Sequence, residues 1–120
     1  MKKKIIIAVN SIFNLINHRV GLIKGLRDEG YEVIAISPTD EFASRLKELD
    51  CQHVPLEMER KGTHIFRDLM LFLRYRRLLK QFMPDVYLGF TIKPNIYGSL
   101  AAQSLGIPVI NNISGLGTVF

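Results

Sequence analysis

Short apolar runs alternate with longer helical patterns along most of the 120-residue chain. The first run, Lys4 to Val9, is continuous and β-branched, which is typical of a strand covered on both faces. Further runs predict strands at 31–36, 51–56, 85–88 and 107–110. Strands that alternate with helices in this way predict an α/β fold with a parallel sheet and right-handed crossovers.

The segments between the strands carry helix signals. Gly30 and Gly106 stand where C-terminal glycine caps belong, and Pro84 ends the longest pattern. In that pattern one apolar face, which includes Leu71, Tyr75 and Leu79, is expected to pack on the sheet. We expect helices at 17–29, about 40–49, 64–83 and 95–105, with a polar turn over 10–16.

The predicted fold is a Rossmann-like, doubly wound sheet of about five parallel strands in the order 3-2-1-4-5. In that order the first and fourth strands are neighbours and their helices lie on opposite faces, so a crevice opens between the loops that follow them. The chain stops at Phe120, directly after the loop 111–117 and without a closing helix. We therefore expect most of one domain of a larger protein.

The composition limits the classes of partner. The net charge is +5, from 16 Lys and Arg against 11 Asp and Glu, and it suits nucleic acid, anionic lipid or phosphorylated ligands without choosing among them. The single cysteine, Cys51, excludes an internal disulfide. No apolar stretch is long enough for a membrane span, so we expect a soluble or peripheral protein.

Several familiar site patterns are missing. The loop after the first strand, NSIFNLINHR, has no glycine, which argues against a dinucleotide-binding enzyme. A phosphate loop and a G-x-S-x-G elbow are also absent. His18, His53 and His64 are not spaced as metal ligands. We expect no metal and no cofactor.

The stretch GFTIKPNIYG, residues 89–98, carries the strongest site signal. It joins a predicted buried strand to a helix rich in small residues, and such loops bind ligands in open parallel sheets. Thr91 offers a hydroxyl, Lys93 a cation, and Asn95 an amide beside the helix start at Pro94. The helix N-terminus and Lys93 would attract an anion. The alternative is a solvated loop lysine beside a helix-starting proline.

Across the predicted crevice lies the loop after the first strand. His18 and Arg19 are expected in the first turn of the following helix, facing Lys93. Amides suit sugar hydroxyls and cations suit phosphates, although such amides also cap turns and helices. The amides that surround this mouth are Asn10, Asn14, Asn17, Asn111 and Asn112.

The longest helix has a second flank on which basic and apolar residues mix. Such a surface can lie on an anionic bilayer. Alternatively, the arginine stems only cover apolar surface while their charged ends reach water. The apolar members are Phe66, Leu69, Met70 and Leu73, and the predicted membrane-facing cations are Arg74, Arg76, Arg77 and Lys80.

Two stretches resemble one enzyme family. GFTIKPNIYGSLAAQSLGIPVINNISGLGTVF, and the early segment FNLINHRVGLIKGLRDEGYEVIAISP, are similar to bacterial retaining glycosyltransferases of family 4, of the kind that act on undecaprenyl-diphosphate-linked sugars. KPNIYGSLAA and SGLG are the more specific parts, and the similarity extends over essentially all 120 residues.

The resemblance implies a GT-B enzyme with two Rossmann-like domains. Residues 1–120 would be the truncated N-terminal domain, on the acceptor side. The C-terminal domain, which holds the nucleotide-sugar through a Glu-x7-Glu-type motif, has no counterpart in this chain. Some relatives have a histidine near the fifth-strand loop, where this chain reads Asn111 to Ser114, so no catalytic residue is assigned. Such enzymes retain the configuration of the transferred sugar and typically need no metal.

We therefore expect transfer of a sugar, from a UDP-sugar, to a polyprenyl-diphosphate-linked acceptor in cell-surface polysaccharide, capsule or glycan synthesis. The enzyme would be peripheral, on the cytoplasmic face of the membrane, and the 120 residues alone would be inactive. Arg19 and Lys93 would bind acceptor phosphate, and Gly115 and Gly117 would let backbone approach. The other predicted acceptor contacts are Asn10, Asn14, His18, Thr91, Asn95 and Ser114.

Two alternatives from other classes remain open. A flavodoxin-like or receiver-like binding module would share the sheet, but a receiver needs acidic residues after the first strand and AVNSIF has none. A nucleic-acid-binding domain suits the charge, yet no aromatic-rich basic motif supports it. We therefore expect no nucleic-acid partner.

Overall fold

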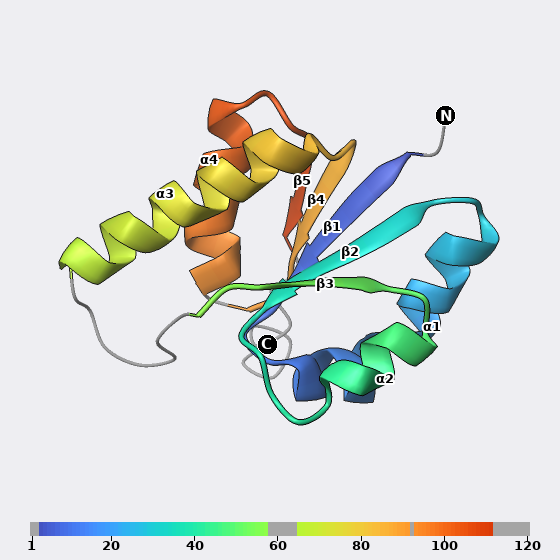
Figure 1. Cartoon of the computed structure of the whole chain (residues 1–120). Coiled ribbons are helices and arrows are strands. Elements are labelled where there is room, and N and C mark those ends of the chain that lie inside the picture. The colour runs from blue at the N-terminus through green and yellow to red at the C-terminus, as the bar shows by residue number, and fades with distance from the viewer. Residues whose placement is uncertain (1–2, 58–64, 92, 112–120) are drawn as a thin grey trace, which may run out of the picture.

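The computed structural model describes residues 3–57, 65–91 and 93–111, with the backbone alone for residues 14, 18, 65 and 111. Strands and helices alternate along this part of the chain (Figure 1). The elements are β1 (Lys4–Ala8), α1 (Ile12–Asp28), β2 (Glu32–Ser37), α2 (Ala43–Glu48), β3 (Gln52–Pro55), α3 (Ile65–Phe82), β4 (Val86–Gly89), the π-helical turn η1 (Pro94–Gly98), α4 (Ser99–Ser104) and β5 (Val109–Asn111).

The strands form one parallel sheet in the order β3-β2-β1-β4-β5, which confirms the predicted fold. β1 lies at the centre. Its last residue, Ala8, pairs with Ile36 of β2 and with Gly89 of β4. From β1 to β3 each strand is added on one side of β1, and after β3 the chain crosses back to the other side, so β4 is paired with β1.

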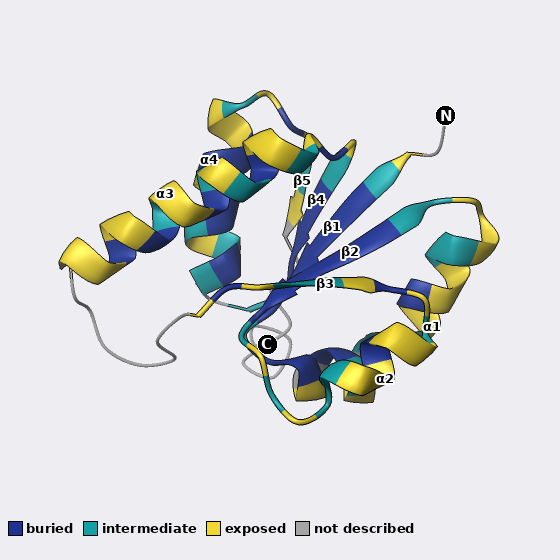
Figure 2. Cartoon of the chain, viewed as in Figure 1, coloured by how far each residue is buried: buried dark blue, intermediate teal, exposed yellow. Residues whose placement is uncertain are grey.

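Both faces of the sheet are covered by helices (Figures 1 and 2). Ile5 and Ile7 of β1 belong to the core under α1 and α2, whereas Ile6 and Ala8 belong to the core under α3 and α4. A strand buried on both faces needs a continuous apolar sequence, as β1 has. Cys51 packs in the first of these cores, and burial raises the pKa of its thiol to about 11.

Glycine caps end α1 and α4 as predicted. Gly30 and Gly106 have φ values of 93° and 74°, which favour glycine. The amide of Gly30 donates to the carbonyl of Arg27 at 2.9 Å, and the amide of Tyr31 donates to Leu26 at 3.0 Å. This pair of bonds is a Schellman motif, and the same motif follows α4.

The prediction was wrong for the start of α1. The helix begins at Ile12, not at 17, so the polar turn expected over 10–16 is short. Ile12 and Leu15 are fully buried, and this burial extends the helix toward β1. The amide of Leu15 donates to the carbonyl of Ser11, which places Ser11 at the N-cap position. Serine is a preferred N-cap residue, and it was the signal for the earlier start.

A close approach of backbone to ring fixes the segment after β4. The hydroxyl of Tyr87, which is fully buried, donates to the carbonyl of Pro94 at 2.7 Å. A Cβ added at Gly98 would lie 1.7 Å from that hydroxyl oxygen and 2.4 Å from Cζ. Gly98 is therefore a position at which only glycine fits.

Gly98→Ala is expected to destabilise the domain by about 2–3 kcal/mol, because Tyr87 must move from its buried site and give up its bond to Pro94. Chemical denaturation measures this change. Gly25→Ala is the matched control, since an added Cβ at this position in α1 meets nothing within 4 Å beyond its chain neighbours and the backbone of its own helix. It is expected to stabilise by about 0.5–1 kcal/mol. Equal stability of the two variants would contradict the packing described.

Candidate functional site

The loops after β1 and β4 leave the sheet at adjacent points. Ala8 pairs with Gly89, and the amide of Phe90 donates to the carbonyl of Ala8 at 3.1 Å. Asn10 and Thr91 each lie two residues beyond that pair. The carboxyl edge of these two strands is where an open α/β sheet binds ligands.

Arg19 reaches this edge from α1. The guanidinium carbon lies 4.7 Å from the centroid of the Phe90 ring, a cation–π distance. Because α1 begins at Ile12, Arg19 and His18 lie in its second turn. Their predicted place in the first turn was wrong, and the free amides at the N-terminus of α1 belong to earlier residues.

The turn η1 begins at Pro94, five residues after β4 ends at Gly89. The amide of Asn95 donates to the carbonyl of Thr91 at 2.8 Å. π-helical turns are rare and frequent at functional sites. The hydroxyl oxygen of Thr91 is buried, and within the described part of the chain no group hydrogen-bonds to it. A buried hydroxyl usually has a partner, so this one is placed to bind water or a polar ligand atom.

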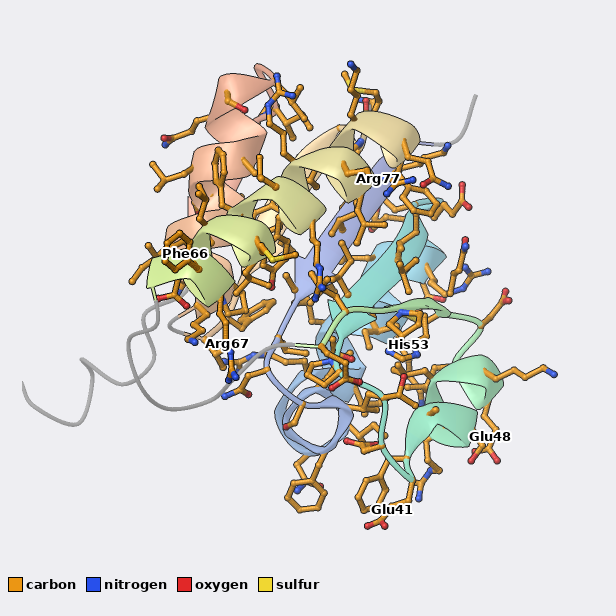
Figure 3. The ribbon with its side chains drawn as sticks, turned by 60° about the vertical axis from the view of Figure 1, so that its left-hand side comes forward. Glu41, Glu48, His53, Phe66, Arg67 and Arg77 are labelled. Atoms are coloured by element: carbon orange, nitrogen blue, oxygen red, sulfur yellow. The ribbon has the colours of Figure 1, made fainter. Side chains whose placement is uncertain are left out.

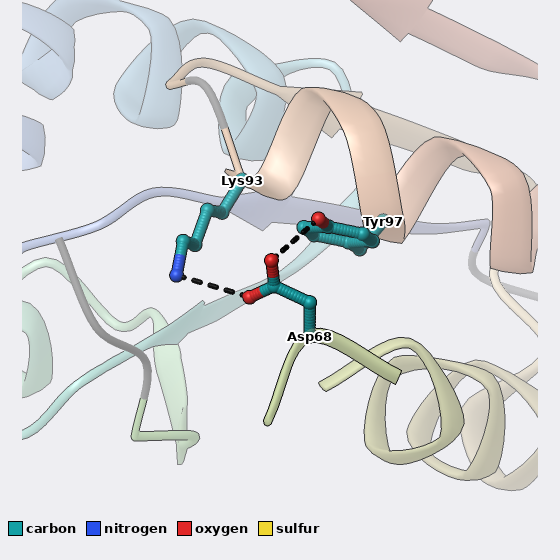
Figure 4. Close-up of polar contacts among 3 residues, drawn as sticks. All are labelled: Asp68, Lys93 and Tyr97. Atoms are coloured by element: carbon teal, nitrogen blue, oxygen red, sulfur yellow. Dashed lines mark hydrogen bonds and ion pairs between the residues drawn. The ribbon is translucent and has the colours of Figure 1, made fainter. Parts of the chain in front are cut away.

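Lys93 is neither solvated nor free. Its Nζ lies 3.2 Å from Oδ1 of Asp68 in the first turn of α3, and the two side chains are only 13% and 12% exposed. The hydroxyl of Tyr97 donates to Oδ2 of the same carboxylate at 2.8 Å (Figure 4). This bond raises the pKa of Tyr97, because the phenol proton is held by the carboxylate. Three side chains thus join α3 to the segment after β4.

A pocket of about 360 Å³ lies beside this contact. It contains three cationic and two anionic side chains, and small-molecule sites have volumes in this range. An excess of one positive charge in a partly enclosed space favours an anion. The residues that line the pocket are Glu57, Arg67, Asp68, Met70, Leu71, Arg74 and Lys93.

The two cations predicted to bind phosphate face different sides of the sheet. Arg19 lies over Phe90, which belongs to the core under α1, whereas Lys93 is turned toward α3. Asn10 and Thr91 lie on the loops after β1 and β4, and Asn95 lies in η1. The side chains of Asn14 and His18 lie outside the described residues, as do Ser114, Gly115 and Gly117 in full.

Asp68 and Arg67 were missed from the sequence. Asp68 follows the spacing of the buried face of α3, three residues before Leu71 and seven before Tyr75. A carboxylate on an apolar helix face needs a partner, and that was the available signal. Asp68 was overlooked because an acidic residue in the first turn of a helix is usually interpreted as solvated and as stabilising the helix dipole.

The outer face of α3 carries the predicted mixture of apolar and basic residues. Phe66 is 82% exposed, and three further apolar side chains on this face are more than half exposed. Figure 3 shows Phe66 and Arg67 at the start of the helix and Arg77 farther along it. Nε of Arg76 donates to Oγ of Ser104 at 3.1 Å, which directs this predicted cation toward α4. Arg74, Arg77 and Lys80 are exposed.

Neither a membrane span nor a metal cluster is found in the described ranges. None of their helices combines the length and apolarity that a bilayer crossing requires. Within 3–57, 65–91 and 93–111, no three His, Cys, Asp or Glu side chains are grouped to hold a metal ion.

Lys93→Met is expected to destabilise the domain by about 2–3 kcal/mol, because Asp68 would stay largely buried without its cation. Lys80→Met removes an exposed lysine from α3 and is expected to change stability by less than about 0.5 kcal/mol. Thermal or urea unfolding of both variants at one ionic strength measures the difference. A Lys93→Met chain as stable as the Lys80→Met control would show that the ion pair is unimportant.

Comparisons with known proteins agree on the fold. Over 108 residues the chain is 30% identical to N,N′-diacetylbacillosaminyl-diphospho-undecaprenol α-1,3-N-acetylgalactosaminyltransferase of Campylobacter jejuni, an alignment that covers 89% of this chain and 29% of the relative. MurG of Acinetobacter baumannii superimposes with a TM-score of 0.70 at 23% identity, covering 91% of this chain and 34% of that one. A glycosyltransferase of Rickettsia africae gives 0.71 at 18% identity, covering 92% and 29%.

The chain therefore spans about a third of the length of these proteins. Its sheet and strand order correspond to one Rossmann-like part of a GT-B glycosyltransferase. The glycosyl transferase 4-like family model matches residues 5–120. The chain belongs to the glycosyl transferase 4-like family.

Proposed function

We propose that this chain is the N-terminal, acceptor-binding domain of a glycosyltransferase that moves a sugar from a UDP-sugar to a polyprenyl-diphosphate-linked acceptor. The reaction would retain the configuration of the sugar and serve cell-surface polysaccharide or glycan synthesis. Family membership supports sugar transfer, and the name of the Campylobacter relative supports a lipid-diphosphate acceptor. A second domain would supply the donor site, so the 120 residues alone would be inactive.

One observation carries the acceptor class: the cationic pocket and the apolar outer face of α3 adjoin. Met70 belongs to both, because it lines the pocket and is 52% exposed. A polyprenyl diphosphate needs cations for its diphosphate and an apolar surface beside them for its first isoprene units. Arg67 and Arg74 line the pocket from the same helix that presents the apolar face.

The same helix is proposed to hold the enzyme on the inner face of the cytoplasmic membrane. Exposed apolar side chains can enter the headgroup region, and neighbouring cations are attracted to anionic lipid. The arrangement would keep the acceptor lipid in the bilayer while its diphosphate lies in the pocket. The apolar contacts would come from Phe66, Leu69, Met70 and Leu73, and the ionic ones from Arg74, Arg77 and Lys80.

The acceptor proposal is tested with neutral vesicles that contain a small fraction of polyprenyl diphosphate. Vesicles with matched anionic charge, supplied as phosphatidylglycerol and polyprenol, are the control. We expect binding to be at least about tenfold tighter to the diphosphate vesicles, because several charge-assisted bonds converge on one group. Arg67→Met with Arg74→Met is expected to abolish the preference, while Arg77→Met keeps it. Equal affinity for both kinds of vesicle would refute the acceptor class.

The membrane proposal is tested by charge reversal. Changing Arg74, Arg77 and Lys80 to Glu is expected to weaken sedimentation with phosphatidylglycerol vesicles by more than about tenfold, since each basic residue near such a surface contributes about 1 kcal/mol. Changing three exposed cations on the opposite helices to Glu alters the net charge equally and is the control. Those cations are Lys24, Arg45 and Lys47.

Parallel loss in the two triple variants would mean that overall charge, not the α3 face, decides binding. Phe66→Ser with Leu73→Ser tests the apolar part separately. We expect these two changes to weaken binding that persists at high salt, because screening removes the ionic part of the attraction. Unchanged high-salt binding would exclude insertion of this face.

A further inference from the structure

We propose that Asp68 is a positioning residue of the acceptor site, which holds the Lys93 ammonium in the pocket wall and fixes the segment after β4 against α3. The inference rests on the proposed function for what Lys93 binds. The contacts of Asp68 with Lys93 and Tyr97 are independent of that function, because the structure shows them directly (Figure 4).

The two carboxylate oxygens of Asp68 accept hydrogen bonds from two residues at η1. Oδ1 accepts from Lys93, at the N-cap of η1, and Oδ2 accepts from Tyr97, four residues later. Both partners therefore sit on the same turn of η1, and one acid on α3 holds both. A free lysine side chain would have to be ordered by its ligand at an entropic cost, and Asp68 has already fixed this one.

The held ammonium can still bind a ligand. A lysine has three N–H donors, and only one is directed at Oδ1 of Asp68. Lys93 also lines the pocket, where Arg67 and Arg74 supply further charge. Because both carboxylate oxygens of Asp68 accept bonds from the protein, the acid is engaged with Lys93 and Tyr97.

Asp68 could instead act only as a negative charge that repels an anion from the pocket. Glu57 makes the two possibilities separable. It lines the same pocket, and the amide of Thr39 donates to its Oε1 at 3.5 Å. Asp68→Asn and Glu57→Gln therefore each remove one negative charge from the pocket, but only the first removes the carboxylate that binds Lys93 and Tyr97.

The experiment measures binding of inorganic diphosphate to the chain by calorimetry. If Asp68 positions Lys93, Asp68→Asn is expected to weaken binding roughly fivefold, while Glu57→Gln strengthens it through the lost repulsion. Asp68→Glu keeps the charge and is expected to recover part of the loss. Diphosphate affinity that is unchanged or raised by Asp68→Asn would overturn the proposal.

A second readout does not need the ligand. The absorbance titration of Tyr97 is obtained by subtracting the curve of a Tyr97→Phe chain from that of its parent. Asp68 raises the pKa of this phenol, so Asp68→Asn is expected to let Tyr97 ionise at lower pH. Amide exchange over residues 93–97 is expected to become faster in the same variant. Thermal unfolding of each variant confirms that the folded chain is compared.

The two readouts separate the two proposals. If the unaltered chain binds no diphosphate, the pocket proposal fails, and the positioning proposal is decided by Tyr97 and amide exchange alone. If Asp68→Asn leaves both of these unchanged, Asp68 does not position the segment, whatever the pocket binds.

Discussion

The pairing of β1 with β4 is the constraint on which the site depends. β1 is buried on both faces, with Ile6 and Ile7 fully inaccessible, so it must lie in the middle of the sheet. β2 occupies one of its edges and β4 the other. The crossover that brings the chain back to β4 passes over the face opposite α1, and this reversal separates α1 from α3. The loops after Ala8 and Gly89 then leave the sheet at neighbouring points, and the pocket described above lies on the α3 side of the second loop, where Lys93 meets α3.

The two cations at the carboxyl edge of β1 and β4 have different partners because they lie on different faces of the sheet. Arg19 lies on the α1 side, where its guanidinium makes a cation–π contact with the ring of Phe90. Lys93 turns to the α3 side and meets Asp68. A largely buried ion pair adds little net stability over an apolar pair of the same shape, but a partner left alone is costly. The pair therefore contributes chiefly to where Lys93 is placed.

Most of the fold was predictable because local pattern and tertiary burial agree. The continuous apolar sequence of β1, the glycines at the ends of α1 and α4, and the spacing of Leu71 and Tyr75 each have a local cause that tertiary packing reinforces. The start of α1 was missed because Asn10 and Asn14 read as turn residues. Burial of Ile12 outweighs that local preference, as tertiary packing does for many helix ends.

The site was less predictable because it depends on side chains from distant segments. Lys93 was identified as a cation in the loop after β4, but its partner Asp68 is 25 residues earlier in the chain. A wheel places Asp68 on the inner face of α3 without saying which loop it meets. The pocket needs Arg67 and Arg74 at a distance from Lys93 that only the packing of α3 on the sheet defines. Spacing within one element is read from sequence, whereas distances between elements are not.

The two faces of α3 are linked by the core that holds the helix. Tyr75 and Leu79 are fully buried against the sheet, so α3 cannot rotate about its axis without exposing them. Asp68 and Leu69 are consecutive, and about 100° of helical rotation separates them. Fixing the inner face thus fixes where Leu69 points, and the reverse holds as well. The packing of α3 that holds Asp68 against Lys93 and Tyr97 therefore also sets the direction in which the exposed side chain of Leu69 points.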